Sequence, residues 1–368
     1  MAVLDEAQIR ALRMRALLLT GEHPHRSVGE VVTWMGAMQA QDYASGAWSL
    51  GIRLPGSTLA SIESALEHGA ALRTWPMRGT VHLVPSRDAR WMLDLMSAKP
   101  LAGAAARREY LGLSLDHLER AAAALEVALQ GGKLLTRAQC LAVIANAGVA
   151  LPGQASYHAL WWTSQIGLTC IGPQRGKEQT FALLDEWAPH PVTLSREEGL
   201  TEIATRYVRS HGPATVKDLS RWTGLGIRDC RAGIAGAGAA LVEVDTVAGP
   251  MVVAAAALDA GFPADAGAAL APPGFDEYML GYGDRSALIS PDHFDAVVPG
   301  GNGVFRATLV KDGSVVGTWK RTLRTRTVVV DAEPFARLSA RDRRALEGAL
   351  AHYGAFLERD VEVRWAND

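Results

Sequence analysis

The residues with the most specific chemistry in this chain are two glutamines that flank one small apolar residue, Gln39-Ala40-Gln41. They follow an amphipathic helical pattern and precede an aromatic residue, Tyr43. Because an amide does not titrate, the pair is a poor general acid or base. Its oxygens can hold a water molecule and stabilise a nearby cation, which suits a positively charged sugar transition state. The alternative is two exposed glutamines at a helix end, and the three residues alone do not decide between the two.

A second candidate segment is Arg78–Pro85, whose residues alternate between polar and apolar as in a half-buried strand. The alternation predicts Arg78, Thr80 and His82 on one face, where they offer a cation, a hydroxyl and an imidazole. Gly79 would let a ligand or another backbone approach closely. A solvent-facing strand has the same pattern, but this one falls in the same predicted module as the paired glutamines.

Other catalytic motifs are incomplete. His23-Pro24-His25 has two imidazoles but no cysteine or carboxylate cluster to complete a metal site. Ser45 lacks the nucleophile-elbow pattern, and no glycine-rich loop is followed by the Lys-Ser/Thr pair of a phosphate site. The segment 274–278 carries two acids at a domain edge. It could hydrogen-bond between modules or bind a cation, and we favour the structural role.

Composition indicates an ordinary globular protein of several modules. The chain has 368 residues, of which 48% are hydrophobic and 21% charged, enough for two to four modules with a sizeable core. The N-terminal segment lacks the pattern of a signal peptide, and no apolar run approaches a membrane span. The three cysteines are far apart and show no metal-ligand spacing. We therefore expect a cytoplasmic protein with no membrane partner.

Basic residues are concentrated in two stretches, although the formal net charge of the chain is −2. Residues 300–330 have a balance of +5, because six basic residues face the single acid Asp312. These six are Arg306, Lys311, Lys320, Arg321, Arg324 and Arg326. The second stretch contains Arg206, Arg209, Lys217, Arg221, Arg228 and Arg231. Such runs are often solvated faces, but together they permit a DNA-binding surface.

Three segments have the same order of predicted elements. Each contains a helix that begins with a capping box, at Ser27–Glu30, Thr136–Gln139 and Thr215–Asp218. Each capped helix follows another helix and is followed by a further helical stretch and then by extended sequence. This order is that of a winged helix, in which three helices precede a β-hairpin.

The third segment is the clearest of the three. We predict helices at 195–210, 216–222 and 226–234, followed by wing strands at 241–247 and 250–255. The last of these helices is a candidate for binding in the major groove. Winged helices also serve as dimerisation or scaffolding units, and we expect some of the three to do only that.

The remaining sequence changes to strands and turns. Asp312-Gly313 is a strong hairpin signal between two strands. The predicted elements are strands at 305–310, 315–319, 324–330 and 361–365 and a helix at 338–357. We therefore predict an α+β fold with tandem winged-helix modules and a small β-rich C-terminal domain. The predicted boundaries are 1–103, which holds the two glutamines, then 104–194, 195–260 and 261–368.

Four features together resemble the winged-helix DNA glycosylase family of the AlkZ/YcaQ type. They are Gln39–Gln41, Thr74–His82, Arg221–Gly224 and Pro273–Tyr278, and their order extends over almost the whole chain. Each feature is common by itself, whereas the combination is specific. The glutamine at position 41 is typical of the AlkZ branch, because the YcaQ branch carries aspartate there.

The resemblance implies a monofunctional glycosylase that cuts the N-glycosidic bond of alkylated purines in double-stranded DNA, including interstrand crosslinks through purine N7. It implies base excision repair of alkylation damage without metal or organic cofactor. Members that protect antibiotic producers from their own DNA-alkylating product are the nearest analogy. We further expect the protein to act as a monomer.

Under this interpretation, Gln39 and Gln41 are the catalytic residues, which position water and direct amide dipoles at the developing sugar charge. The predicted DNA-binding residues near the lesion are Arg78, Thr80, His82 and Tyr43. The predicted contacts to the phosphate backbone, or on a hairpin inserted in a groove, are Lys320, Arg321, Arg324 and Arg326. No lysine lies in either candidate segment to support lyase chemistry.

Two other functions fit part of the sequence. A non-catalytic winged-helix transcription regulator would use the basic stretches but gives no role to the paired glutamines, and it would prefer a defined DNA sequence. A protein-interaction scaffold would bind DNA weakly and with little dependence on salt.

Overall fold

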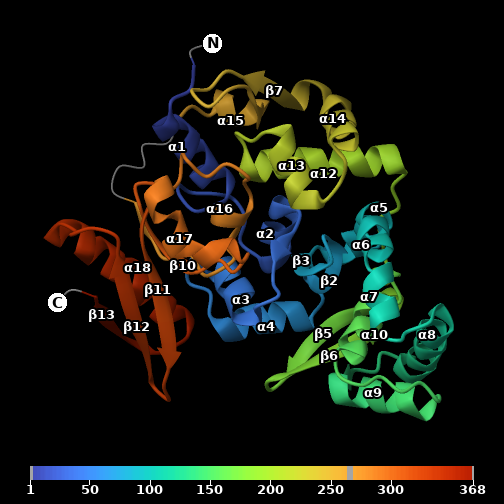
Figure 1. The fold of residues 1–368 in the computed structure, drawn as a ribbon. Coiled ribbons are helices and arrows are strands. Elements are labelled where there is room, and N and C mark those ends of the chain that lie inside the picture. Colours follow the sequence, from blue (N-terminus) through green and yellow to red (C-terminus); the bar gives the residue numbers. More distant parts are fainter. Residues whose placement is uncertain (1–2, 263–267, 367–368) are drawn as a thin grey trace. The chain divides into compact units, whose positions relative to one another are not determined.

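The computed structural model describes residues 3–262 and 268–366 (Figure 1). Contacts divide the chain into two compact units. The first unit combines Met1–Ile62 with Leu200–Asp368, and the second is Glu63–Gly199. Helices and sheets occur in both, which confirms the α+β class. The four predicted modules are a finer division than these units, and their boundaries stay a prediction.

The first unit begins with helices that are capped by local side chains. Its N-terminal elements are α1 (Glu6–Ala16), α2 (Val28–Met35), β1 (Met38–Gln39), α3 (Tyr43–Gly51) and α4 (Leu59–Glu67), the last of which continues into the second unit. Ser27 caps α2, and Glu30 completes the predicted capping box. Such a cap contributes about 1 kcal/mol. At its C-terminal end, α2 is followed by Gly36, whose φ of 79° favours glycine.

The next part of the first unit has the order of a winged helix, as predicted. Its elements are α12 (Arg196–His211), α13 (Val216–Thr223), α14 (Ile227–Gly236), η2 (Gly238–Ala240), β7 (Leu241–Val244), β8 (Met251–Ala254) and α15 (Ala255–Asp259). Thr215 and Asp218 form the predicted capping box of α13. Gly224, in the left-handed conformation, ends α13 and turns the chain toward α14. Side chains of α1 pack against the β7–β8 wing in one apolar cluster.

The C-terminal part of the first unit is a five-stranded sheet in the order β13-β12-β11-β10-β9 with α18 beside it. The elements are β9 (Ala269–Leu270), α16 (Glu277–Leu280), η3 (Pro291–His293), α17 (Phe294–Val297), η4 (Pro299–Gly301), β10 (Ala307–Lys311), β11 (Ser314–Leu323), β12 (Thr327–Pro334), α18 (Ala340–Phe356) and β13 (Asp360–Trp365). The predicted hairpin at Asp312-Gly313 is confirmed, with φ of 50° and 72° at the two residues. The parallel pairing of β12 with β13 requires the crossover that α18 provides.

The β11–β12 hairpin corrects two predicted strand boundaries. β11 continues past residue 319 to Leu323, and β12 begins at Thr327 rather than at residue 324. Pairing of Leu323 with Val328 leaves the residues between them to reverse the chain. Arg324 and Arg326 therefore lie in an exposed turn, not in a strand.

The second unit contains an antiparallel sheet and a helical cluster. Its strands are β2 (Leu72–Met77), β3 (Thr80–Val84), β4 (Leu135–Thr136), β5 (Thr169–Arg175) and β6 (Glu178–Leu183), in the order β3-β2-β5-β6-β4. Its helices are η1 (Ser86–Asp88), α5 (Ala89–Met96), α6 (Ala98–Gly103), α7 (Ala105–Tyr110), α8 (Leu115–Leu129), α9 (Arg137–Asn146), α10 (Gln154–Gln165) and α11 (Leu184–Trp187). Thr136 and Gln139 form the predicted capping box of α9. Leucines of α8 pack with residues of α9, α10 and β6 in the core.

Candidate active site

The paired glutamines lie where the chain passes from β1 into α3. Gln39 is the last residue of β1 and is 8% exposed, whereas Gln41 is exposed. The Gln39 side-chain oxygen, Oε1, is buried and has no hydrogen-bond partner among the described residues. Leaving a buried polar group unpaired costs about 1–3 kcal/mol. The Gln39 side chain therefore keeps an unused hydrogen-bond acceptor, which the functional interpretation of the pair requires.

The residue between the glutamines is held by close packing against α3. Ala40 is buried, and a Cβ added to Gly46 would lie 3.0 Å from the Ala40 Cβ and 3.2 Å from its Cα. Asp42 begins α3 by accepting a hydrogen bond from the Ser45 N–H at 2.7 Å. Small residues at positions 40 and 46 thus let the helix start directly against the glutamine segment.

A buried carboxylate fixes the backbone of the first glutamine. Glu277, at the start of α16, is 1% exposed, and its Oε1 accepts the Gln39 N–H at 2.9 Å. Its Oε2 accepts the Trp222 Nε1–H at 3.0 Å and lies 3.4 Å from His211 Nε2. Hydrogen bonds of this kind to a charged acceptor are about twice as strong as neutral ones. Glu277 therefore ties β1 to α12 and α13.

The aromatic side chains around this carboxylate are themselves ordered. Tyr207 stacks on His211 with ring centroids 4.7 Å apart, and its hydroxyl donates to the Gly281 carbonyl at 2.6 Å. Burial raises the pKa of Tyr207 well above its usual value, so the hydroxyl stays a donor. The Tyr282 hydroxyl donates to the His211 carbonyl at 2.9 Å.

The neighbouring acid, Asp276, holds the C-terminal end of α3, the helix that follows the glutamine segment. Asp276 binds Arg53 through two hydrogen bonds, of 2.7 and 3.0 Å, and also accepts from the Ser49 hydroxyl in α3. Arg53 also donates to the Leu17 carbonyl at 2.8 Å. Both charged side chains are almost fully buried. The two acids of segment 274–278 thus have the structural role that the sequence favoured.

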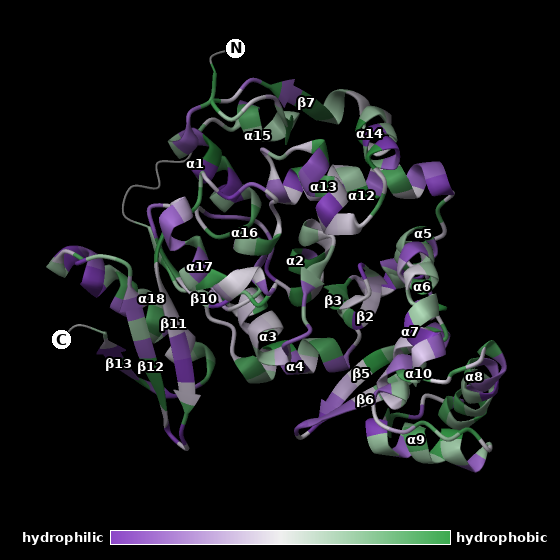
Figure 2. Ribbon diagram, in the orientation of Figure 1, coloured by the Kyte–Doolittle hydropathy of each residue, from purple (hydrophilic) through white to green (hydrophobic). Residues whose placement is uncertain are grey.

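The four basic residues predicted to bind phosphate differ in their surroundings. Lys320 pairs with Glu333 at 3.1 Å, and the Arg321 guanidinium lies 3.6 Å from Asp42 with its side chain 22% exposed. Arg324 and Arg326 are exposed in the β11–β12 turn and form no ion pair with any described residue. Figure 2 shows hydrophilic residues along this hairpin. The turn therefore presents the more accessible charge.

Tyr43, predicted to lie near the lesion, is the first residue of α3 and is half-buried.

The second candidate segment belongs to the second unit and differs from its prediction. Arg78 lies outside the strand, because Arg78 and Gly79, with φ of 54° and 68°, form the two-residue turn between β2 and β3. His82 is fully buried rather than facing solvent. Its Nδ1 lies 2.8 Å from the Thr80 carbonyl, and its Nε2 lies 3.5 Å from Arg78 Nη2. The three polar residues do come together, with Thr80 half-buried and Arg78 exposed at the turn.

Other groups offer little alternative chemistry. Burial raises the pKa of Cys140 and Cys170 to about 12, which makes them poor nucleophiles. Within residues 3–262 and 268–366, no three His, Cys, Asp or Glu side chains are grouped to hold a metal ion. None of the helices in those ranges has the length and apolar character needed to cross a membrane.

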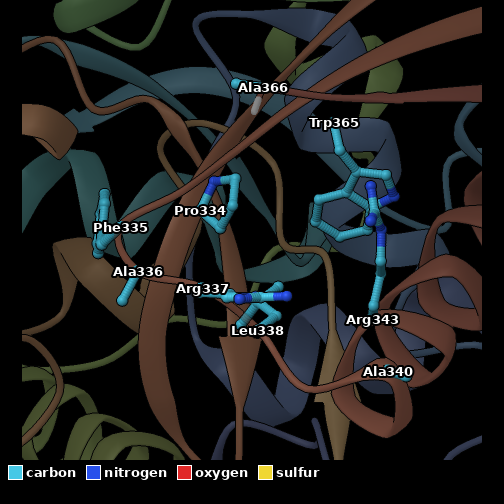
Figure 3. A pocket seen from close by; sticks show the side chains of 9 residues that line it. All are labelled: Pro334, Phe335, Ala336, Arg337, Leu338, Ala340, Arg343, Trp365 and Ala366. Carbon is cyan, nitrogen blue, oxygen red and sulfur yellow. The ribbon is translucent and has the colours of Figure 1, made fainter. Parts of the chain in front are cut away.

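A cavity of about 630 Å³ lies between the ends of β12 and β13 and the start of α18. Figure 3 shows Arg343 beside the Trp365 ring, with the guanidinium carbon 4.9 Å from the ring centroid. Neither glutamine lines this cavity. It is therefore separate from the glutamine site.

The partners of the glutamine segment were not predicted from the sequence. The motifs 221–224 and 273–278 were recognised as features of a resemblance, but nothing in them indicated that Trp222 and Glu277 meet. Arg53 carried no sequence signal. The Gln39–Glu277 and Arg53–Asp276 contacts each join residues that are more than 200 positions apart in the sequence.

Comparisons with known proteins match the chain to one family and one fold. Residues 32–356 match the model of a family described as DNA glycosylase AlkZ-like. An interstrand DNA cross-link repair glycosylase of Streptomyces sahachiroi is 28% identical over 380 residues, which cover 94% of each protein. The solved structure of the Streptomyces sahachiroi DNA glycosylase AlkZ has a TM-score of 0.81, covers 99% of this chain and 100% of its own, and is 24% identical. The structural match supports the fold.

Proposed function

The chain belongs to the AlkZ-like DNA glycosylase family, and from this premise we propose that it hydrolyses the N-glycosidic bond of cationic N7-alkylated purines in duplex DNA. The observation that carries the proposal is the Gln39 Oε1 atom, which is buried and unpartnered among the described residues while its own backbone is held by Glu277. An amide oxygen that is held in place and has no hydrogen-bond partner can accept a hydrogen bond from water or stabilise a cation.

The proposed reaction uses the positive charge of the lesion. The bond between sugar C1′ and purine N9 breaks, and its electron pair neutralises the alkylated purine. The sugar acquires oxocarbenium character, and a water oxygen forms the new bond to C1′. An amide is too weak a base to keep the water proton, which passes to solvent. Gln39 and Gln41 would orient the water and stabilise the sugar cation, so undamaged purines should react very slowly.

The proposed DNA contacts follow from exposure. Arg324 and Arg326, at an exposed turn without ion pairs to described residues, suit the phosphate backbone or a groove. Lys320 and Arg321 would contribute less, because each already lies near an acid. All four residues stay candidates for DNA contacts, with Arg324 and Arg326 ahead of Lys320 and Arg321.

Tyr43 in the first unit and Arg78 and Thr80 in the second are proposed as DNA contacts, and His82 is proposed as a positioning residue for Arg78. Arg78 is exposed, and His82 is buried 3.5 Å from it. His82 would therefore orient Arg78 rather than touch DNA itself.

The relative's name concerns interstrand crosslinks, and we propose crosslinked purines as a second substrate. A purine joined to the opposite strand cannot be fully flipped into a pocket, unlike most glycosylase substrates. The exposed position of Gln41 is consistent with a site that a bulky lesion can reach.

The first test measures release of 7-methylguanine from methylated duplex DNA by wild type, Gln39→Ala and Gln41→Ala. The matched control is Gln130→Ala, which removes an exposed glutamine in the second unit. Excision by wild type and by the control that collapses in both site variants supports the proposal. Unchanged excision in the site variants removes the glutamines from the mechanism. If wild type releases no base from methylated or crosslinked DNA but binds one sequence preferentially, the regulator is the better function.

A further inference from the structure

The third helices of the three winged-helix patterns differ sharply in burial. In α3, seven of nine residues are buried, and in α10, nine of twelve. In α14, only Cys230 and Gly233 of ten residues are buried. A helix buried on most of its surface cannot lie in a DNA groove. The burial pattern therefore singles out α14.

The glycine face of α14 packs closely against α12, and the opposite face is exposed to solvent. A Cβ added to Gly233 would collide with the Leu200 carbonyl oxygen of α12, and one added to Gly236 with the Thr201 side chain. The outward face carries Ile227, Arg228, Arg231, Ala232 and Ala235, all exposed. Their spacing of three and four positions places them on one side of the helix. Two arginines thus stand beside alanines that allow close approach.

The structure also divides the second basic stretch of the sequence into two groups. Arg206 pairs with Glu202 at 2.6 Å, and Arg209 donates to the carbonyls of Thr33 and Trp34 at 3.1 and 3.0 Å. These two cations are committed to the fold. The other group is exposed and forms no ion pair or hydrogen bond through its side chains with described residues, and it comprises Lys217, Arg221, Arg228 and Arg231.

The second group lies on α13 and α14, which are in contact and meet at the Gly224 turn (Figure 1). The acids nearby are Asp229, which is half-buried, Asp218, which is buried in the capping box of α13, and Asp284, which is exposed next to Gly283 beside Arg221. Positive charge therefore dominates this exposed surface.

We propose that the α13–α14 surface, defined as the exposed side chains of Lys217, Arg221, Arg228 and Arg231 with Ala232 and Ala235, binds duplex DNA beside the lesion. The inference rests on the proposed action on DNA. Its charge complements phosphates, and the early residues of the second helix in such a turn are those that enter a groove. A single strand is a poorer fit, because the only aromatic side chain of α13 and α14, Trp222, is buried and cannot stack on a base.

The experiment compares two matched double variants of the full chain. R228A/R231A removes two exposed arginines three positions apart from α14, and R341A/R344A removes two with the same spacing and exposure from α18. Binding of an undamaged 30-base-pair duplex is measured over a series of NaCl concentrations. Each phosphate contact contributes about 0.9 to the salt slope, so R228A/R231A should lower the slope by roughly 2 and weaken binding about tenfold or more.

The control separates a contact from an effect of total charge. R341A/R344A should keep the wild-type slope. Equal losses in the two double variants, or no loss in R228A/R231A, overturn the proposal.

A third variant tests close approach without changing charge. Ala232→Trp adds bulk to the outward face only, so thermal unfolding should stay near that of wild type while duplex binding weakens several-fold. Wild-type affinity in a folded Ala232→Trp protein means that α14 does not contact DNA closely, which also overturns the proposal.

Excision distinguishes this inference from the proposed function. At enzyme concentrations below saturation, R228A/R231A should slow excision from methylated DNA in proportion to its loss of duplex affinity, whereas R341A/R344A should not. If wild type excises no lesion but loses duplex affinity in the α14 variants alone, the proposed function fails and the α13–α14 surface stands.

Discussion

The glutamine segment and the β11–β12 turn are both polar, yet they are built in opposite ways. Around Gln39, buried carboxylates, aromatic rings and an arginine hold each other in short hydrogen bonds. At the turn, Arg324 and Arg326 are exposed and have no ion pair within the described chain. The two regions differ in the positional precision that their roles require. At the glutamine segment, catalysis needs dipoles placed within a few tenths of an ångström. At the turn, the arginines attract a polyanion over about a Debye length, so their exact positions matter less.

The largest effect should come from breaking the ion pair beside the site. Asp276→Ala leaves Arg53 as a buried charge without its carboxylate partner and should lower the free energy of unfolding by about 3–5 kcal/mol. Urea denaturation followed by circular dichroism measures this loss. A change below about 1 kcal/mol, the size of an exposed ion pair, would show that this network is not preorganised by the pair.

Gln39→Ala should have the largest effect on catalysis with little effect on stability. Removing one preorganised dipole costs about 10²–10³ in rate in comparable sites. Because Gln39 Oε1 has no hydrogen-bond partner among the described residues, its loss should not weaken the fold. Single-turnover excision and thermal unfolding, measured together, check the prediction, and a large drop in stability would contradict it.

Glu277→Gln should have an intermediate effect. The amide keeps an oxygen for the Gln39 N–H but presents an NH₂ group toward Trp222 or His211, which leaves a buried donor poorly paired. We expect a loss of about 1–3 kcal/mol in stability and a smaller fall in excision than with Gln39→Ala. Asp276→Asn is the matched control, since it also neutralises a buried acid but keeps the Gln39 contact. An equal fall in single-turnover excision in both would assign the effect to stability alone.

R324A/R326A should act on binding alone. The slope of duplex affinity against salt should fall by roughly 2 if both arginines contact phosphates. The excision rate at saturating enzyme should not change, because neither residue contacts the glutamine segment. A loss of rate at saturation would mean that the turn also helps to place the lesion.

Lys320→Ala should have the smallest effect. Its ammonium is already paired with Glu333 at the surface, and such pairs contribute about 0–1 kcal/mol. Stability and the salt slope should both stay close to wild type. A fall in slope as large as that of R324A/R326A would mean that the paired Lys320 contacts phosphate as well as the unpaired arginines do.

Much of the fold followed from local patterns. The capping boxes at Ser27, Thr136 and Thr215 all formed, and the hairpin turn at Asp312-Gly313 formed where its residues predicted it. Strand limits were less accurate. Arg78 and Arg324 were assigned to strands but lie in turns, because the end of a strand depends on where its partner pairs.

Charge patterns showed the same limit. Arg206, Arg209, Arg228 and Arg231 belong to one basic stretch of sequence, but the first two are committed to Glu202 and to backbone carbonyls while the last two are exposed. Composition gives the number of charged residues, whereas burial and pairing in the fold determine which of them can contact DNA.

By itself, the sequence determined which residue types could do the chemistry and where helices begin, because an amide's properties and a capping hydrogen bond depend on groups at most a few positions apart. Only the tertiary structure decided that Glu277 holds the backbone of Gln39, 238 positions away, and that Asp276 holds Arg53, 223 positions away. The physical reason is that such contacts are made by folding as a whole. No local sequence pattern predicts which distant carboxylate will accept a hydrogen bond from a buried N–H.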